Sequence, residues 1–222
     1  MPPRRPDAGR GARPASIPGW RRRIYPDLPG IGRTPAPPSI ADADDVLLVG
    51  HSAGAYYAQA LAHRITSRVA GLALVCPLLP STHDVPAHVP VIADNALGDA
   101  EFRDYFVVQT PAMLARYEQF VAPAAALVDA AAMERIGQRW ELTTPAGETC
   151  AGPVLLVAGR QDATVGWAAT VELLEVYPGA TLAVLDGAGH ALPHEQPGVL
   201  AALVQDWLRR VATARSGDPP GR

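Results

Sequence analysis

The chain has 222 residues, of which 48% are hydrophobic and 18% are charged, and its formal net charge is −3. That length and composition predict a single globular domain with a sizeable core, and the weak charge argues against a nucleic-acid-binding surface. The chain has only two cysteines, Cys76 and Cys150, and we find neither a secretory-signal pattern nor an apolar run of about 18 residues, so we expect a cytoplasmic protein without a disulfide framework that does not act at a membrane.

The chain begins with residues 1–22, which are rich in arginine, proline and glycine and show no hydrophobic periodicity. Such a composition cannot bury a core, so we expect a disordered arm. A weak strand is predicted near 24–25. After it, Pro29, Pro35, Pro37 and Pro38 leave only about residues 39–45 for the crossover that two parallel strands require. One helix is therefore expected to be lost or reduced to a turn.

Farther along, short apolar runs alternate with segments of helical periodicity. The predicted strands are 46–49, 69–76, 154–158 and 181–185, and the predicted helices are 53–63, 168–177 and 198–211. Short β-rich runs separated by helices predict an α/β fold, a mostly parallel sheet with helices on both faces. We expect this core to comprise 23–77 and 150–212, followed by a disordered tail at 213–222.

Residues 78–149 interrupt the alternation without a convincing strand. They hold aromatic residues on segments of helical spacing, as in the series Met113, Leu114, Tyr117 and Phe120. We predict a helical cap whose aromatic rings shape an apolar pocket, with Phe106, Tyr117 and Trp140 as candidate substrate contacts. For any single ring, packing of the cap onto the main domain is the better supported interpretation.

The segment Gly50-His51-Ser52-Ala53-Gly54 joins a predicted strand to a predicted helix. A serine on so sharp a turn takes a strained backbone conformation, and larger side chains in place of the two glycines would crowd the strand and the helix. The turn lifts the hydroxyl above the sheet edge, next to the unpaired N–H groups of the helix N-terminus. Gly-x-Ser-x-Gly alone is a weak pattern in a chain with 20 glycines.

Two apolar runs later in the chain add to the evidence from the Gly-x-Ser-x-Gly pattern. The strand at 154–158 is followed by Asp162, and the strand at 181–185 is followed by a glycine-rich turn and His190. Residues just beyond the carboxyl ends of parallel strands converge on one crevice. Serine, aspartate and histidine are therefore expected to meet there, in that chain order.

These features together resemble the α/β-hydrolase family, which uses the order Ser, Asp, His. The resemblance covers about residues 23–211. It includes 25–34, similar to the family's Asp-x-Pro-Gly-x-Gly-x-Ser/Thr loop, and Gly189-His190 with His194-Glu195-Gln196-Pro197, which matches its histidine loop.

The resemblance implies a role for each residue. Ser52 would be the nucleophile, His190 the base that removes its proton, and Asp162 the group that orients the imidazole. Asp186 is the competing acid, although a position four residues before the histidine better suits a turn residue. The N–H of Ala53 would be one oxyanion donor, and His51 would brace the turn. The other histidines, His63, His83, His88 and His194, lack metal-ligand spacing, so neither a metal nor a cofactor is expected.

The chain also departs from the family. The loop that normally supplies a second oxyanion donor, and the strands before it, have no counterpart ahead of residue 24. The first hypothesis is a serine hydrolase that cleaves an ester, or with less support an amide or an activated C–C bond, of a small apolar molecule through an acyl-enzyme. The alternatives are a catalytically impaired or non-catalytic remnant that binds apolar ligands, and a perhydrolase, acyltransferase or lyase with the same residues. An aspartate nucleophile is disfavoured because residue 52 is serine. An uncovered sheet edge would favour a homodimer.

Overall fold

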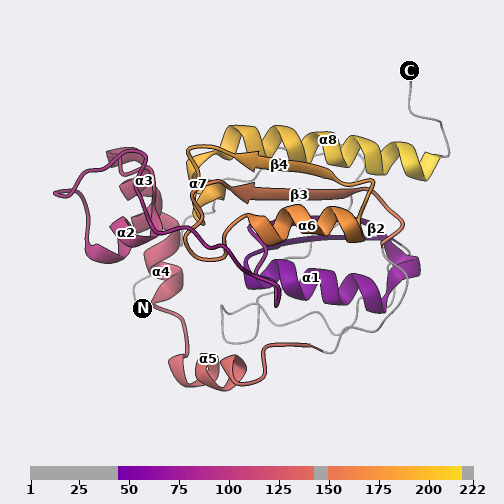
Figure 1. The fold of residues 1–222 in the computed structure, drawn as a ribbon, viewed down its shortest axis with the longest axis horizontal. Coiled ribbons are helices and arrows are strands. Elements are labelled where there is room, and N and C mark those ends of the chain that lie inside the picture. Colours follow the sequence, from indigo (N-terminus) through magenta and orange to yellow (C-terminus); the bar gives the residue numbers. More distant parts are fainter. Residues whose placement is uncertain (1–44, 143–149, 217–222) are drawn as a thin grey trace, which may run out of the picture.

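The computed structural model describes residues 45–142 and 150–216, so the predicted arm, the predicted strand near 24–25, the motif at 25–34 and the shortened crossover at 39–45, apart from Asp45, lie outside the described residues. The described core is a four-stranded parallel sheet in the order β1-β2-β3-β4 (Figure 1). The strands are β1 (Val46–His51), β2 (Val69–Val75), β3 (Val154–Gly159) and β4 (Thr181–Leu185). Each strand predicted within the described residues is confirmed to within two residues at its ends.

The sheet is held in register by pairs such as Leu74 with Leu156 and Val157 with Ala183. Every residue of β3 is buried. This is why its sequence is a continuous apolar run rather than an alternating one, since parallel strands are covered on both faces. The parallel pairing also brings the carboxyl ends of all four strands to one edge.

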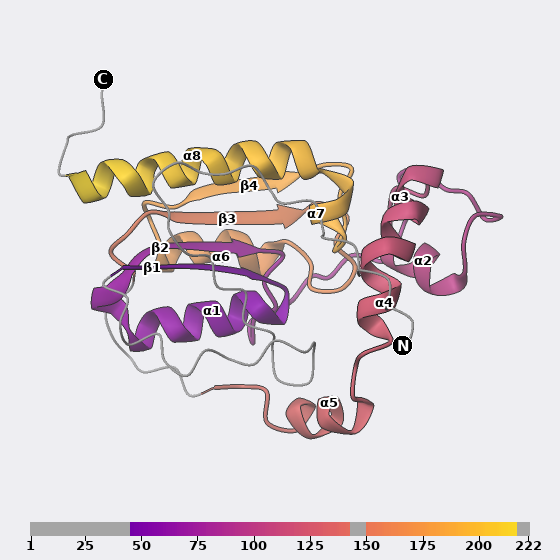
Figure 2. The ribbon, with the colours of Figure 1, turned by 180° about the vertical axis from the view of Figure 1, so that it is seen from behind.

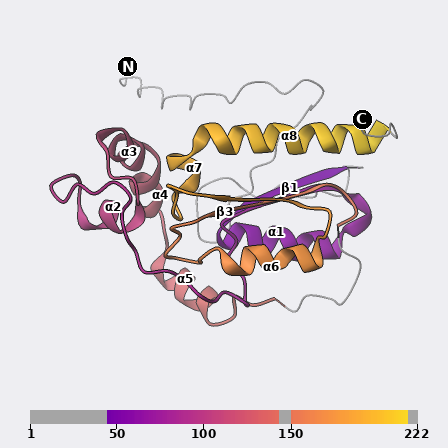
Figure 3. The same ribbon diagram turned by 45° about the horizontal axis from the view of Figure 1, so that its top comes forward.

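Helices cover both faces of the sheet (Figure 3). On one face lie α1 (Ala53–Arg64) and α6 (Ala168–Val176), whose apolar residues pack against Leu72 and Leu74. On the other lies α8 (Pro197–Ser216), which packs Trp207 against Leu155. The predicted fold class, a parallel sheet between two layers of helices, is confirmed.

The last helix is longer than predicted. It continues to Ser216 rather than ending near 211, so the disordered tail expected at 213–222 is wrong for 213–216, and 217–222 lie outside the described residues. Residues 212–215 include two alanines and an arginine, which favour a helix. Arg215 also forms an ion pair with Asp45, beside the start of β1. None of the helices in the described part of the chain has the length and apolarity that a bilayer span requires.

Between β2 and β3 the chain leaves the sheet, and we call residues 77–142 the β2–β3 insertion. Its helices are α2 (Ala100–Tyr105), α3 (Pro111–Arg116), a π-helix (Tyr117–Val121), α4 (Ala122–Ala125) and α5 (Ala130–Gly137). Figures 1 and 2 show α2, α3 and α4 beyond the carboxyl ends of the strands, near the short helix α7 (Leu192–Glu195). The segment predicted to be helical is 78–149, and its described part, 78–142, forms helices and no strand, with one isolated bridge between Ile92 and Val108, whereas 143–149 lie outside the described residues.

The helices of the insertion pack on a small aromatic core of their own, formed by Phe102, Phe106 and Tyr117. Met113 and Leu114 join it as predicted, but Phe120 is 49% exposed. Pro123 explains the difference, because a proline in a helix removes one hydrogen bond and pushes away the carbonyl four residues before it. The chain responds with a π-turn at Tyr117–Val121, which rotates Phe120 off the apolar face.

Candidate active site

Ser52 lies on the turn between β1 and α1. Its φ of 55° and ψ of −127° are strained values for a residue with a side chain. Gly50 permits the turn, since a Cβ there would lie 2.3 Å from the carbonyl oxygen of Gly54. The Ser52 N–H donates to the carbonyl of Val75, which anchors the turn to β2. The side chain is half-buried, so its hydroxyl is held at the sheet edge and is reachable.

Asp162 lies three residues beyond β3 and is fully buried. Its Oδ1 accepts hydrogen bonds from the N–H groups of Thr164 and Val165, at 2.9 and 3.0 Å. Burial acts to raise the pKa of this carboxyl. The hydrogen bond and charge of His190 and the two backbone N–H groups outweigh it, so the pKa is lowered. Asp162 is therefore a buried carboxylate that remains ionised.

His190 forms hydrogen bonds with both Ser52 and Asp162. Its Nδ1 lies 2.9 Å from Asp162 Oδ2, and its Nε2 lies 2.9 Å from Ser52 Oγ. A carboxylate can only accept, so Nδ1 carries the hydrogen and Nε2 is free to accept from the serine hydroxyl. Asp186, the competing acid, is exposed and accepts instead from Gln161 Nε2 at 2.6 Å. Ser52, His190 and Asp162 thus form one continuous chain of hydrogen bonds.

His51 contacts the histidine loop. Its Nε2 donates to the backbone carbonyl of His190 at 3.0 Å, and the two rings lie 4.8 Å apart. Burial, together with repulsion from a charged His190, lowers the pKa of His51 to about 4. A neutral His51 that contacts the loop rather than the serine agrees with the bracing role expected from the sequence.

Ala53 is the first residue of α1, and its N–H is among the first four of that helix, which have no acceptor inside it. The N–H follows directly on the serine, where the positive end of the helix dipole lies. This position is suited to an oxygen that develops negative charge near Ser52. The absence of a loop for a second donor ahead of residue 24 stays a prediction, because residues 1–44 lie outside the described part of the chain.

The predicted substrate contacts are placed as follows. Phe106 is 0% exposed and Tyr117 is 6% exposed, and both belong to the aromatic core of the β2–β3 insertion. The Tyr117 hydroxyl donates to Glu101. Trp140 is half-buried, with its ring 5.1 Å from that of Tyr56 on α1. The packing interpretation thus fits Phe106 and Tyr117, and the substrate-contact role of all three stays a prediction.

Two residues near His190 were missed as site residues. Tyr105 lies at the end of α2, and its ring is nearly perpendicular to the imidazole, at 79°, with the centroids 6.3 Å apart. Burial, followed by nearby acidic groups, raises its pKa to about 12, so the phenol stays protonated. Glu195, in α7, accepts a hydrogen bond from the N–H of Gly189. The signal for Glu195 was its place in the histidine-loop motif, whereas nothing in the sequence separates Tyr105 from the aromatic residues around it.

One group of side chains near the site has the composition of a metal site. The ligand atoms of His51, Cys76 and His190 lie within 4.8 Å of one another. The nitrogens of His190 already bond to Ser52 and Asp162, and burial raises the pKa of the Cys76 thiol, which opposes the thiolate that a metal requires. The chemistry of this group therefore fits the hydrogen-bonded chain better than a resident metal.

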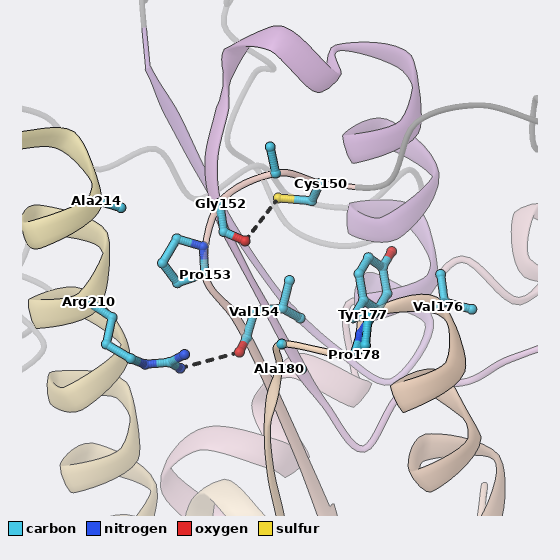
Figure 4. Close-up of a pocket in the computed structure, with 12 residues that line it drawn as sticks. Cys150, Gly152, Pro153, Val154, Val176, Tyr177, Pro178, Ala180, Arg210 and Ala214 are labelled. Carbon is cyan, nitrogen blue, oxygen red and sulfur yellow. Dashed lines mark hydrogen bonds between the residues drawn. The ribbon is translucent and has the colours of Figure 1, made fainter. Parts of the chain in front are cut away.

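A cavity of about 350 Å³ lies away from the serine, at the amino ends of β3 and β4 (Figure 4). Pro153, Tyr177 and Arg210 are among its lining residues. Arg210 is engaged, since it donates to the carbonyl of Val154 and pairs with Asp206. Because Ser52, Asp162 and His190 gather at the opposite ends of the strands, this cavity is separate from the candidate active site.

A parallel sheet with a serine on a strained strand-to-helix turn, bonded to a histidine and an aspartate beyond later strands, defines the class of α/β hydrolases. Comparison with known proteins agrees with that class. Residues 6–203 match the family described as the alpha/beta hydrolase family, and the chain belongs to that family.

Individual relatives are more distant. The chain is 38% identical over 73 residues to epoxide hydrolase A of Mycobacterium tuberculosis (strain ATCC 25618 / H37Rv), a match that spans 32% of this chain and 23% of the relative. The structure resembles that of an alpha/beta superfamily hydrolase from Oenococcus oeni PSU-1, with a TM-score of 0.75 and 21% identity over 84% of this chain and 80% of the other. It also resembles a thermophilic esterase from Thermogutta terrifontis, with a TM-score of 0.50 and 17% identity over 82% and 77% of the two chains. At these identities the two structures support the fold.

Proposed function

We propose that this protein is a serine hydrolase that cleaves a carboxylic ester of a small apolar molecule through a covalent acyl-enzyme. The observation that carries the proposal is the unbroken chain from Ser52 Oγ to His190 Nε2 and from His190 Nδ1 to Asp162 Oδ2, with 2.9 Å at each step. Hydrogen-bonded contact between nucleophile and base, and between base and orienting carboxylate, is the geometry that nucleophilic catalysis by a serine requires.

The reaction follows from the chemistry of these groups. As Ser52 Oγ attacks the ester carbonyl, His190 Nε2 takes the hydroxyl proton, and the ionised Asp162 stabilises the imidazolium. The N–H of Ala53 stabilises the oxyanion of the tetrahedral intermediate. When the intermediate collapses, His190 returns its proton to the leaving alcohol and the acyl group stays on Ser52. A water molecule, deprotonated by His190, then attacks the acyl carbonyl and releases the acid and the free serine.

The apolar substrate is proposed from the β2–β3 insertion, which would act as a cap. Its helices α2, α3 and α4 lie beyond the carboxyl ends of the strands (Figures 1 and 2), and the ring of Tyr105 lies 6.3 Å from that of His190. No residue in the hydrogen-bonded chain would need a metal or a cofactor for this reaction. The homodimer and the cytoplasmic location expected from the sequence stay predictions.

Epoxide opening is a second candidate because of the name of the Mycobacterium relative. A serine that opened an epoxide would form an alkyl ether. Such an ether has no carbonyl for water to attack, so the enzyme would not turn over. Ser52 therefore favours an ester over an epoxide as the substrate.

The proposal is tested with a fluorophosphonate probe and a series of p-nitrophenyl esters of increasing acyl length. We expect stoichiometric labelling of the wild-type protein, none in Ser52→Ala, and unchanged labelling in Ser81→Ala, which removes an exposed hydroxyl. Release of p-nitrophenol should disappear in the same variant. Undiminished labelling of Ser52→Ala would remove that residue from the mechanism, and a folded wild-type protein that resists the probe would indicate a binding protein without catalytic activity.

A further inference from the structure

One carboxylate, that of Glu195, ties together two segments that are distant in the sequence. Its Oε2 accepts from the N–H of Gly189 at 2.7 Å. Its Oε1 accepts from the N–H of Val107 at 2.7 Å and from that of Val108 at 3.2 Å. Gly189 belongs to the histidine loop, and the two valines come just after α2 in the β2–β3 insertion, separated from it by Phe106. The two oxygens therefore face the two sides of an interface.

Both segments that Glu195 joins adjoin His190. Gly189 directly precedes His190 in the chain. The valines follow Tyr105 and Phe106 in the chain, and the ring of Tyr105 lies 6.3 Å from that of His190, nearly perpendicular to it. The segments also touch directly, because a Cβ on Gly189 would lie 2.9 Å from Cγ1 of Val107. A shift of either segment would thus be transmitted to the histidine.

The position of Glu195 is itself tied to the histidine loop. The N–H of Glu195 donates to the carbonyl of Ala191 at 3.1 Å, within the short turn of α7 that follows His190. Burial raises the pKa of the Glu195 carboxyl, and the hydrogen bonds from the three backbone N–H groups act in the opposite direction because they favour its ionised form. Three hydrogen bonds to one half-buried side chain restrain the loop and the insertion as a unit.

We propose that Glu195 is a positioning residue that couples the β2–β3 insertion to His190, so that the cap and the catalytic imidazole take up their working positions together. The proposal rests on the proposed function for its catalytic consequence. It assigns Glu195 no contact with substrate. A substrate that seats against the insertion would act on the imidazole through this carboxylate.

Glutamine at this position tests the coupling because it keeps the shape of glutamate and loses one acceptor. Its carbonyl can serve either Gly189 or the two valines, and its NH₂ group then faces an N–H on the other side. One of the two connections is lost whichever way the amide turns. A displacement of about 1 Å in a catalytic group can reduce the rate about 10²-fold, so we expect a fall in kcat of that order in Glu195→Gln with little change in KM.

The experiment measures kcat per active site, with sites counted by titration with the fluorophosphonate probe, so that unfolded protein does not enter the result. Glu172→Gln is the matched control, because Glu172 lies on α6, its carboxylate is exposed, and it contacts His83 and none of the residues that Glu195 joins. Hydrogen exchange at the amides of Gly189, Val107 and Val108 is measured in the same proteins. We expect faster exchange on at least one side of the interface in Glu195→Gln and none of these changes in the control.

The outcomes distinguish a failure of the positioning role of Glu195 from a failure of the proposed function. Unchanged hydrogen exchange at all three amides in Glu195→Gln would overturn the proposal. Faster exchange together with a kcat per site within about threefold of wild type would also overturn it, because Glu195 would then have only a structural role. If Glu195→Gln does not fold, Glu195→Asp replaces it, since a carboxylate one methylene shorter cannot reach both sides. A wild-type protein that resists the probe would refute the proposed function, and the exchange measurement would still decide whether Glu195 links the two segments.

Discussion

Replacing Asp162 with asparagine tests the candidate active site most directly. Asparagine has nearly the same shape, so the difference lies in its hydrogen-bonding groups. The N–H groups of Thr164 and Val165 point at Oδ1 from 2.9 and 3.0 Å and would hold the amide oxygen at that place. Turning the amide around would leave two buried N–H groups facing an NH₂ group, at about 1–3 kcal/mol for each. The NH₂ group of the asparagine is therefore directed at His190.

That orientation reverses the tautomer of the histidine. Nδ1 would have to accept a hydrogen bond from the asparagine NH₂, so the proton moves to Nε2, and Nε2 can no longer accept the proton of Ser52. In a reference serine protease the equivalent change lowers kcat about 10⁴-fold. This corresponds to about 5.4 kcal/mol of transition-state stabilisation at about 1.36 kcal/mol for each factor of ten. We expect a loss of that order here.

The assay is the second-order rate constant for labelling of Ser52 by the fluorophosphonate probe, together with kcat for a p-nitrophenyl ester. Asp186→Asn is the matched control, because that exposed carboxylate bonds to Gln161 and should leave both rates near wild type. Thermal unfolding shows whether each variant is folded. A folded Asp162→Asn protein within tenfold of the wild-type rate, or a large loss in Asp186→Asn, would refute the assignment of the carboxylate.

Three further predictions concern the turn before Ser52, the contact of His51 with the histidine loop and the packing of α8 on the sheet. Gly50→Ala should lower the free energy of unfolding by at least about 2 kcal/mol in chemical denaturation, because its Cβ would lie 2.3 Å from a backbone oxygen of α1; a neutral effect would contradict the turn geometry. The pKa of His51 is lowered to about 4, so its contribution to stability is fully present above the unfolded value of about 6.5 and is lost as the pH falls through 4. His51→Gln should therefore flatten the loss of stability between those pH values, and an unchanged curve would show that His51 does not carry it. Trp207→Phe removes the donor to the carbonyl of Pro153 at 2.8 Å and part of a buried ring, which should cost about 2–4 kcal/mol in denaturant unfolding; a loss below about 1 kcal/mol would count against this role.

The sheet could be predicted from the sequence because its cause is local. Strands covered on both faces must be apolar throughout, and runs such as 154–159 end where polar residues and glycines begin. The meeting of Ser52, Asp162 and His190 was also predictable, since parallel strands bring their carboxyl ends to one edge. The choice of Asp162 over Asp186 was favoured but left open, because it depends on where each side chain points.

The remaining features depend on contacts between distant segments. Which aromatic residue of the insertion would face His190 could not be predicted, because Tyr105 and Phe106 are neighbours with similar side chains and only packing separates them. The extension of α8 involves an ion pair between Arg215 and Asp45, at opposite ends of the described chain. For the same reason the three hydrogen bonds of Glu195 have no signature in local periodicity.

The sheet order sets a geometric requirement on the histidine loop. Adjacent strands lie about 4.8 Å apart, so β1 and β4 are separated by about 14 Å, yet the imidazole that follows β4 touches the hydroxyl that follows β1. The short segment 186–189 must therefore carry the imidazole back over the ends of β3 and β2. This segment packs closely on the end of β3, since a Cβ on Gly159 would lie 2.4 Å from the Gly189 oxygen. Each added or deleted residue changes the reach of an extended chain by about 3.5 Å, more than a hydrogen bond tolerates. The number of residues in this segment therefore matters as much as their identity, because a loop of another length would carry an intact imidazole to the wrong strand.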